Sequence, residues 1–288
     1  MSGTDLYIIA AGSGSRINAA VPKALLQIVD APCLTSNLQR IGHKFRKIFI
    51  VTNVLMHDQW RAYFRGLEVA HPELAKLVVD LPIRSGFGDG HATLQGFLSA
   101  EGRESDLSRD IVVAWGDVFF PNGGIIDEML AITPEGSGLI PAIHESTPYV
   151  SLLVDAKMRC LSADFSRHGE HHSAGYHDQS VFRFDLIRLK RSLCDLHNAL
   201  WKNGRYIVPG GELSLLYSFH ELYNSSDPAY VYETSHSTLS FNTMDDVVRI
   251  QRKMASHKIS PPAVTPLRPE NELPRVPLEG SAFSSRVE

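Results

Sequence analysis

A short apolar run that ends at a glycine-rich loop constrains the fold of this chain most strongly. The run Leu6–Ala11 (LYIIAA) has the all-apolar pattern of a strand whose two faces are both covered. The following residues, Gly12–Arg16 (GSGSR), allow a tight turn and a close approach of the backbone to a ligand. In open parallel sheets, ligands bind beyond the carboxyl ends of such strands. This stretch therefore predicts the first strand of an α/β sheet and a binding loop after it.

Further apolar runs alternate with amphipathic segments through the first half of the chain. This alternation predicts a mostly parallel sheet with helices on both faces. The expected strands are Lys47–Thr52, Lys76–Asp80 and Asp110–Ala114, and the expected helices are Thr35–His43, His57–Phe64 and His91–Ala100.

The second half of the chain has strands that follow one another without full crossover helices, which predicts a mixed sheet built onto the first half. We expect one domain over residues 1–258, with halves 1–125 and 126–258. Residues 259–288 hold six of the sixteen prolines and few large apolar groups, which predicts an extended or disordered tail. The expected strands are Gly138–Ile143, Val150–Val154, Gln179–Phe184 and Tyr230–Glu233, and the expected helices are Leu186–Trp201, Glu212–Glu221 and Met244–Lys258.

Composition excludes several classes of protein. The net charge of −4 over 288 residues is not the excess of positive charge that is typical of proteins around which nucleic acid wraps. No segment approaches the roughly 20 apolar residues that a membrane span requires. The three cysteines are far apart and make neither a metal spacing nor a disulfide framework, as in a reducing compartment. We therefore expect a soluble cytoplasmic protein that binds neither nucleic acid nor membrane.

The loop after the first strand has the composition of a phosphate-binding site. Successive backbone N–H groups in a glycine-rich turn form a concavity for anions. Arg16 can bind phosphate oxygens with two hydrogen bonds, and Lys23 supplies a second positive charge. The loop lacks the Gly-Lys-Ser/Thr of a Walker loop and the third glycine of a dinucleotide fingerprint. A tight turn with surface basic residues remains the alternative interpretation.

The stretch IIAAGSGSRI…VPKALLQI resembles the signature of the nucleotidyltransferase superfamily, which includes sugar-1-phosphate nucleotidyltransferases and N-acetylglucosamine-1-phosphate uridylyltransferase. Further segments resemble other motifs of the superfamily, in the same order along the chain. They are Gly86–Ala92 for the base-binding loop, Val112–Val118 for the metal-binding aspartate, Ser173–Tyr176 and Gly211–Leu213 for the acceptor site, and Phe241–Asp246 for the second metal ligand.

The resemblance implies a Rossmann-like α/β fold with an integrated acceptor-binding region in the second half. It implies transfer of an NMP group from an NTP to a phosphorylated acceptor, a sugar 1-phosphate above all, with release of pyrophosphate and with Mg²⁺ as cofactor. A homo-oligomer is compatible with it. The implied site residues are Arg16 and Lys23 for catalysis, Ala11, Gly12, Ser13, Gly14, Ser15, Gly88 and Asp89 for the nucleotide, Gly175 and Glu212 for the acceptor, and Asp117 and Asn242 for the metal.

Departures from the superfamily pattern leave the substrates open. Pro82–Ser85 stands where uridylyltransferases have a glutamine, and Asp89 replaces a small hydroxyl residue. A carboxylate beside the base could accept from an exocyclic amine of cytosine or guanine. A cytidylyltransferase with a phosphocholine- or phosphonate-type acceptor therefore stays open, as do a glycosyltransferase and a nucleotide-binding sensor without turnover. The glycosyltransferase alternative lacks its Asp-x-Asp motif, since the strand ends in Gly116-Asp117-Val118.

Some candidate residues also have ordinary structural roles. Asp117 could cap a turn after a strand, and Asn242 could cap a helix whose dipole Asp245 or Asp246 would serve. The cluster of His168, His171, His172 and His177 lies in a Gly- and Ser-containing stretch without metal-ligand spacing. We interpret it as a solvated or acceptor-facing loop.

Overall fold

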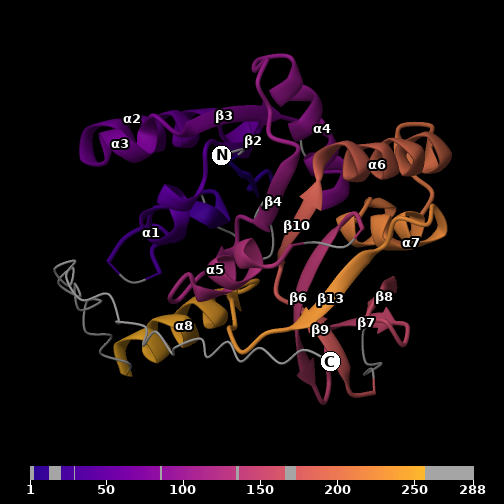
Figure 1. Cartoon of the computed structure of the whole chain (residues 1–288). Helices are drawn as coiled ribbons and strands as arrows, with labels where there is room; N and C mark the ends of the chain where they lie inside the picture. Colours follow the sequence, from indigo (N-terminus) through magenta and orange to yellow (C-terminus); the bar gives the residue numbers. More distant parts are fainter. Residues whose placement is uncertain are drawn as a thin grey trace, which may run out of the picture.

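A computed structural model of the chain describes residues 3–12, 21–28, 30–84, 86–133, 136–165 and 173–256. Within these residues, ten strands form one sheet in the order β3-β2-β1-β4-β10-β6-β9-β7-β8, with β13 paired to β6 (Figure 1). The strands are β1 (Asp5–Ile9), β2 (Ile48–Asn53), β3 (Val78–Ile83), β4 (Asp110–Trp115), β6 (Gly138–Glu145), β7 (Val150–Val154), β8 (Cys160–Phe165), β9 (Gly175–Asp178), β10 (Val181–Asp185) and β13 (Ala229–Glu233).

The direction of the strands changes in the middle of the sheet. Strand β1 pairs in parallel with both β2 and β4, and β2 pairs in parallel with β3. Strand β10 runs antiparallel to β4 and to β6, while β13 is parallel to β6. The carboxyl ends of β1 to β4 therefore lie at one edge of the sheet, where the first half of the chain presents its loops.

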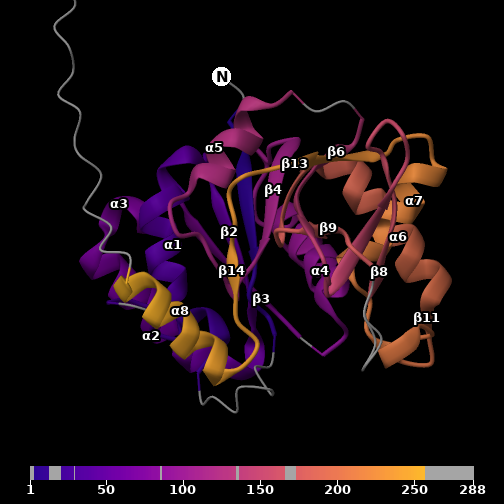
Figure 2. The ribbon, with the colours of Figure 1, turned by 90° about the horizontal axis from the view of Figure 1, so that it is seen from below.

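Helices cover both faces of the sheet, as Figure 2 shows. Helices α1, α2 and α5 pack on one face of the sheet, and helices α4, α6 and α7 pack on the other face. The helices are α1 (Cys33–Ile41), α2 (His57–Ala70), α3 (Pro72–Ala75), α4 (Asp89–Glu101), α5 (Gly124–Ala131), α6 (Leu186–Leu200), α7 (Ser218–Asn224) and α8 (Met244–Ser256), with short 3₁₀ turns η1 (Lys23–Leu25), η2 (Gly42–Lys44), η3 (Val54–Met56), η4 (Pro209–Gly211) and η5 (Leu215–Tyr217).

Burial on both faces explains why the central strands are apolar without alternation. All five residues of β1 and all six of β2 are buried. Residues that point to opposite faces of a strand enter different cores: Tyr7 packs under α4, while Leu6 and Ile8 pack under α1. A strand in the middle layer of a three-layer sandwich must be apolar on both faces. This explains the run of apolar residues near the start of the sequence.

A third, smaller core attaches the last helix to the first half of the chain. Phe119, Phe241 and Val247 are buried together with Ile28 and Cys33. Two short strands, β5 (Val118–Phe119) and β14 (Leu239–Ser240), pair antiparallel beside this core. Helix α8 thereby lies next to α1 rather than next to the second half of the sheet (Figure 2).

The predicted α/β fold with a mostly parallel sheet and helices on both faces is confirmed, and most predicted elements agree within a few residues. The helix expected over Glu212–Glu221 is wrong in its first part. Gly210 and Gly211 have positive φ, and the N–H and carbonyl of Leu213 bond to the loop before α4, so helix begins only at Ser218.

The sequence reading also missed strands β8 and β9 and helix α5. Short strands such as β9 have too few residues to give a period, and Gly175 opens the strand. His177, which the sequence placed in a loop, lies in β9, whereas His168, His171 and His172 lie outside the described residues. The predicted tail 259–288 is outside them as well, and the division of the domain at residue 125 stays a prediction.

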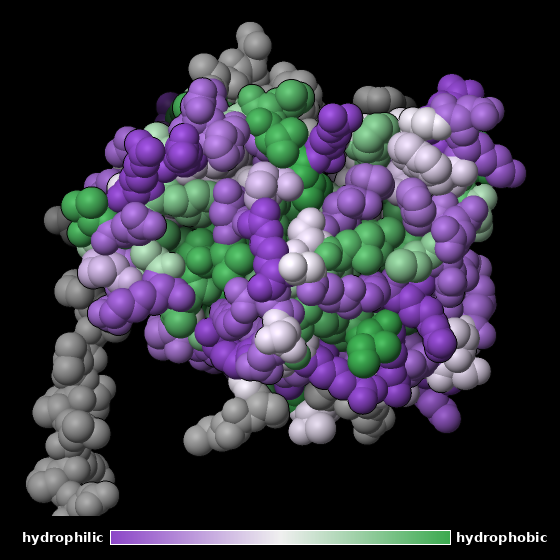
Figure 3. Space-filling model, turned by 90° about the horizontal axis from the view of Figure 1, so that it is seen from above, coloured by the Kyte–Doolittle hydropathy of each residue, from purple (hydrophilic) through white to green (hydrophobic). Residues whose placement is uncertain are grey.

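The described part of the chain contains no helix long and apolar enough to cross a membrane. Figure 3 shows one face of the molecule, on which apolar patches are separated by polar side chains. The most exposed large apolar side chains, Leu55 and Val69, belong to different elements, η3 and α2.

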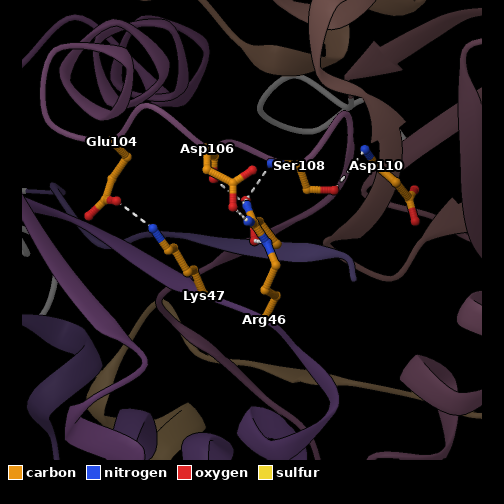
Figure 4. A network of polar contacts seen from close by, with 7 residues as sticks. Arg46, Lys47, Glu104, Asp106, Ser108 and Asp110 are labelled. Carbon is orange, nitrogen blue, oxygen red and sulfur yellow. Dashed lines mark hydrogen bonds and ion pairs between the residues drawn. The ribbon is translucent and has the colours of Figure 1, made fainter. Parts of the chain in front are cut away.

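Ion pairs fasten the amino edge of the sheet, as Figure 4 shows. The fully buried Asp5 carboxylate accepts from Arg46 Nε at 3.0 Å and Nη2 at 2.8 Å, and from the Ser108 backbone N–H at 2.8 Å. Arg46 also contacts the exposed Asp106, and Lys47 pairs with Glu104. These contacts join the start of β1 to the segment before β2 and to the loop before β4, at the edge opposite the predicted binding loop.

We predict that Asp5→Ala lowers the free energy of unfolding by about 3 kcal/mol, because it leaves a partly buried guanidinium and a buried N–H without their acceptor. The matched control is Asp106→Ala: that carboxylate is 83% exposed, and its loss should cost at most about 1 kcal/mol. Denaturant titration of both variants measures the difference. Equal losses in the two variants would contradict this account of the amino edge.

Candidate active site

Three residues from distant parts of the sequence meet at the carboxyl edge of the sheet. Lys23 Nζ lies 3.1 Å from Asp117 Oδ2 and 3.2 Å from Asn242 Oδ1. Lys23 is 94 residues from Asp117 and 219 from Asn242 in the chain. The lysine side chain is 14% exposed, so the ammonium is largely surrounded by protein. The structure therefore brings together one predicted catalytic residue and both predicted metal ligands.

The backbone of β4 places Asp117 at this edge. Gly116 continues the ladder between β1 and β4, since its N–H donates to the Ile9 carbonyl at 2.9 Å. A Cβ on Gly116 would lie 2.7 Å from Ala10 Cβ, which is closer than carbon atoms pack. Only glycine fits there, and the next residue, Asp117, projects beyond the strand.

Pairing between β5 and β14 brings Asn242 to the same place. Ser240 stands opposite Val118, and the Phe241 N–H donates to the Asp117 carbonyl at 3.2 Å. The buried ring of Phe241 anchors this segment in the third core. The side-chain oxygen of Asn242 then accepts from Lys23 Nζ.

Helix α8 has its own cap, so Asn242 is not needed for it. Asp246 N–H donates to Thr243 Oγ1 at 3.2 Å, and Asp246 Oδ2 accepts from the N–H groups of Asn242 and Thr243, both at 3.0 Å. This reciprocal pattern is a capping box. Burial alone would raise the pKa of Asp246, but these hydrogen bonds lower it. Asp246 serves the helix, as the sequence suggested.

The predicted nucleotide-binding loop is described only at its first residues. Ala11 is buried, while Gly12 is exposed, and among the described residues no atom beyond its chain neighbours lies within 4 Å of the position of a Cβ. Packing against the described part of the chain therefore does not demand a glycine here. Ser13, Gly14, Ser15 and Arg16 lie outside the described residues, and their roles stay predictions.

The predicted base-binding loop, Gly88 and Asp89, is bonded to the segment that carries Glu212. Gly88 has φ +94°, and a Cβ there would lie 2.3 Å from the Leu213 carbonyl oxygen. The Leu213 N–H donates to the Phe87 carbonyl at 2.9 Å, and the Leu213 carbonyl accepts from the Gly90 N–H at 2.9 Å. Glycine is required here by its conformation and by this close approach of two backbones.

Asp89 strengthens the same junction with its side chain. Its Oδ1 accepts from the Leu215 N–H at 2.6 Å and from Ser214 Oγ at 3.3 Å. One carboxylate oxygen therefore holds the segment before α7, which the sequence alone did not indicate. The base-contacting role that we expected for Asp89 stays a prediction.

Negative charge gathers around this junction. Burial above all, together with the charges of Asp117 and Glu212, raises the pKa of Asp89 to about 6, although the hydrogen bonds from Leu215 and Ser214 act to lower it. The carboxylates of Asp117 and Glu212 are therefore close enough to Asp89 for their charges to act on it. A concentration of carboxylates favours a cation nearby.

The two predicted acceptor-binding residues lie in different elements: Glu212 follows η4, and Gly175 belongs to β9. Glu212 is exposed, while Gly175 is the first residue of β9 and stands opposite Glu145 of β6. His177, also in β9, has Nδ1 2.8 Å from Glu145 Oε2. Contact of Gly175 or Glu212 with an acceptor stays a prediction.

Sequence reasoning missed an aromatic cluster behind the base-binding loop. The buried Tyr206 hydroxyl lies 2.7 Å from His91 Nδ1 and 2.8 Å from His197 Nδ1. Trp201 stacks on both imidazoles, with ring centroids 5.8 and 5.5 Å apart. Phe87 packs edge-on against Trp201. The cluster joins α4 and the loop before it to α6, and no spacing in the sequence links these residues.

The oxygen atoms beside Lys23 suit a magnesium ion. Mg²⁺ prefers carboxylate and amide or carbonyl oxygens and usually keeps several positions for water and phosphate. Asp117 and Asn242 offer one oxygen each, and both atoms converge on the same ammonium nitrogen. Among the described residues no group of three or more His, Cys, Asp or Glu forms a metal site. A magnesium ion held by two protein ligands and by substrate phosphates fits this arrangement better than an ion held by protein ligands alone.

Comparison with solved structures supports the fold. A nucleoside-diphosphate-sugar pyrophosphorylase from Vibrio cholerae RC9 superimposes with a TM-score of 0.62 at 13% identity, covering 85% of this chain and 99% of that one. HddC from Yersinia pseudotuberculosis, complexed with GMP-PN, gives 0.58 at 14% identity, covering 87% and 99%. The inositol-1-phosphate CTP transferase from T. maritima gives 0.62 at 14% identity, covering 89% and 98%. This chain has a nucleotidyltransferase fold.

The sequence comparisons agree with this fold. The chain is 32% identical over 145 residues to the bifunctional protein GlmU of Ruegeria sp. (strain TM1040), which is 50% of this chain and 30% of the relative. The chain thus matches about a third of the length of that relative. No protein-family profile matches the chain. The resemblance inferred from the sequence motifs is confirmed, and the structure brings Lys23, Asp117 and Asn242 of three of these motifs together.

We predict that Asp89→Asn raises the free energy of unfolding, relative to the wild type, by more at pH 7 than at pH 4.5. The pKa of Asp89 is raised from 3.8 to about 6 in the folded protein, so the folded state holds this proton longer than the unfolded state does. The contribution of Asp89 to the stability of the wild-type protein therefore falls as the pH rises from about 4 to about 6. Asparagine keeps an oxygen that can accept from Leu215 and has no charge to bury.

The measurement is the free energy of unfolding of both proteins at pH 4.5 and pH 7. The variant should gain about 2 kcal/mol in the free energy of unfolding relative to the wild type across this interval. Glu73→Gln, an exposed carboxylate on α3, is the control and should show no such gain. A difference between Asp89→Asn and wild type that stays constant with pH would show that Asp89 is not a destabilised carboxylate.

Proposed function

We propose that the protein transfers an NMP group from an NTP to a small phosphorylated acceptor and releases pyrophosphate. The observation that carries the proposal is the convergence of Lys23, Asp117 and Asn242 at the carboxyl edge of the sheet. This edge is where open α/β sheets bind their ligands. A positive charge and two hard oxygen ligands at one point suit the charge that builds up on a triphosphate during transfer.

The proposed reaction needs no nucleophile from the protein. A phosphate oxygen of the acceptor attacks the α-phosphorus and forms the new O–P bond. The bond between the α-phosphorus and its bridging oxygen breaks, and pyrophosphate leaves with the electron pair. Lys23 neutralises charge on the phosphates, and Arg16 would bind phosphate oxygens with two hydrogen bonds. The chain contributes position and charge.

Asp117 and Asn242 would hold Mg²⁺, which would reduce the repulsion between the two phosphate-bearing substrates. In the structure the Lys23 ammonium lies between the same two oxygens, which supports the presence of positive charge there. Gly88 and Asp89 would adjoin the base, and Glu212 and Gly175 the acceptor.

The acceptor that we propose first is a sugar 1-phosphate or a similar phosphorylated polyol. The support is in the names of similar structures: one is a nucleoside-diphosphate-sugar pyrophosphorylase and another an inositol-1-phosphate CTP transferase. Pyrophosphate release, assayed for each of the four NTPs against a panel of phosphorylated acceptors, identifies the pair. If no pair releases pyrophosphate although an NTP binds, the proposal is wrong.

We predict that Lys23→Ala and Asp117→Ala each lower turnover about a hundredfold or more, because each removes charge stabilisation from the transition state. Lys44→Ala is the matched control: Lys44 pairs with Asp127 away from the site, and its loss should leave turnover within about twofold. Circular dichroism checks the fold of each variant.

Chelation of divalent metal should abolish turnover of the wild type, and added Mg²⁺ should restore it. Turnover that persists in excess chelator would remove Mg²⁺ from the proposal. Wild-type turnover in Lys23→Ala or Asp117→Ala would remove the role assigned to that residue.

A further inference from the structure

The aromatic cluster behind the base-binding loop holds that loop at both of its ends. Residues Gly88–Gly90 lie between Phe87 and His91, and the rings of both flanking residues belong to the cluster. Phe87 meets Trp201 edge-on, with ring centroids 4.9 Å apart, and its centroid lies 5.2 Å from that of His91. Because α4 lies beside α6 (Figure 2), the cluster ties the loop to a neighbouring helix.

The cluster is built on a small hairpin that follows α6. Its two strands, β11 (Trp201–Lys202) and β12 (Arg205–Tyr206), pair antiparallel. The ring of Tyr206 is buried in one small core with Leu213, the residue whose backbone bonds to both ends of the base-binding loop. Backbone bonds and ring packing therefore act on the same few residues.

One hydroxyl in this cluster serves two imidazoles. The Tyr206 oxygen lies 2.7 Å from His91 Nδ1 and 2.8 Å from His197 Nδ1. Burial raises the pKa of Tyr206 to about 12, so the hydroxyl keeps its proton. A phenol has one proton to donate, so it donates to one ring nitrogen and accepts from an N–H of the other ring. Two neutral rings or one imidazolium satisfy both hydrogen bonds, whereas a second imidazolium breaks one of them.

The helix ends decide which ring takes the extra proton. His91 is the third residue of α4, where the partial positive charge of the helix N-terminus disfavours a cation. His197 lies in the last turn of α6, where the helix C-terminus favours one. Burial above all, and then the charge of His197, lower the pKa of His91 below its usual range. His197 is therefore protonated first, and His91 Nδ1 accepts from the Tyr206 hydroxyl.

The other charged groups on the elements around His91 leave this order in place. The Asp89 carboxylate, on α4 itself, accepts from Ser214 and Leu215 in the next segment. The charge that acts on His91 is that of His197. The remaining charged residues on the surrounding elements are exposed, so that solvent screens them; they are Arg84 before α4, Asp195 on α6, Lys202 and Arg205 in the hairpin, and Glu212 before Leu213.

We propose that Tyr206 and His91 are positioning residues for the nucleotide: the hydrogen bond between them fixes the loop Gly88–Gly90, and the loop binds the NTP only while His91 is neutral. This inference rests on the proposed function, because it requires the base at this loop. A proton on His91 Nδ1 turns the acceptor into a donor and breaks the bond from Tyr206. It also places a second positive charge near His197, whose ring centroid is 5.9 Å away.

The consequence for binding follows from the direction of the pKa shift. The pKa of His91 lies below 6.5 in the folded protein, so the neutral ring predominates above about pH 7 and is lost as the pH falls through that pKa. The apparent NTP affinity falls with the fraction of neutral His91. Wild-type affinity should therefore be constant above about pH 7 and weaken below about pH 6.5.

Isothermal titration calorimetry of the full chain tests this dependence without turnover, since no acceptor is present. ATP, CTP, GTP and UTP are each titrated at pH 8, and the NTP that binds most tightly is titrated again at pH 5. Protonation of the NTP phosphates and of Asp89 also changes over this interval. These two effects are common to the wild type and the variants, so affinities are compared between proteins at each pH.

His91→Asn separates the acceptor from the titration. Its amide oxygen can accept from the Tyr206 hydroxyl but takes no proton. This variant should bind the NTP within about twofold of the wild type at pH 8 and at least about threefold more tightly than the wild type at pH 5. The matched control is His71→Asn: His71 follows α2, on the other face of the sheet, and its replacement should leave the wild-type affinity at both pH values.

Tyr206→Phe keeps the buried ring and removes both hydrogen bonds. It should weaken NTP binding at pH 8 at least about threefold, with an unchanged circular dichroism spectrum. A measurement on the wild type needs no variant: long-range ¹H–¹⁵N correlation spectra at pH 8 should show His91 protonated at Nε2 and His197 at Nδ1.

Three results would each overturn the proposal: equal affinities of the wild type and His91→Asn at pH 5, wild-type affinity of Tyr206→Phe at pH 8, or the same tautomer for both histidines. NTP binding with the expected pH pattern but no pyrophosphate release from any NTP–acceptor pair would support the positioning role and contradict the proposed function. Pyrophosphate release with equal affinities at pH 5 would do the reverse. Failure to bind any of the four NTPs would overturn both.

Discussion

The contact of one ammonium group with two side-chain oxygens depends on most of the fold. Lys23 follows the first strand, Asp117 follows β4, and Asn242 precedes the last helix. Their contacts require that β1 and β4 be neighbours and that β14 pair with β5. They also require a glycine at position 116, because Ala10 leaves no room there for a side chain. Packing of the sheet, the tight strand end and the third core thus all act on one point at the carboxyl edge.

The two edges of the sheet have opposite electrostatic arrangements. At the amino edge, carboxylates such as Asp5 are matched by arginine and lysine, and the contacts are saturated. At the carboxyl edge, the charges of Asp117 and Glu212 act on Asp89, and among the described residues Lys23 is the cation in contact with Asp117. An excess of negative charge is costly for stability, and it is the condition under which a metal ion binds.

The sequence predicted those parts of the molecule whose pattern is local. Strand β1 could be read because it is buried on both faces and has no alternation, and Lys23, Asp117 and Asn242 because they stand in motifs of fixed order. The link between Asp89 and Leu215 could not be read, because 126 residues separate them and a buried carboxylate looks like any other aspartate in the sequence. The predicted helix over Glu212–Glu221 was wrong in its first part for the same reason. Leu213 bonds to the segment around Gly88, which is distant in the sequence, instead of to its neighbours in the chain.

The central claim is that the α-phosphorus of an NTP is transferred at the Lys23 edge of the sheet. The most direct measurement follows the label of an NTP carrying ³²P either at the α- or at the γ-position, in the presence of the phosphorylated acceptor found by the screen. The account predicts that the α-label appears in the nucleotidyl product and the γ-label in pyrophosphate. Appearance of the γ-label on the acceptor, or of the α-label in free NMP alone, would contradict it.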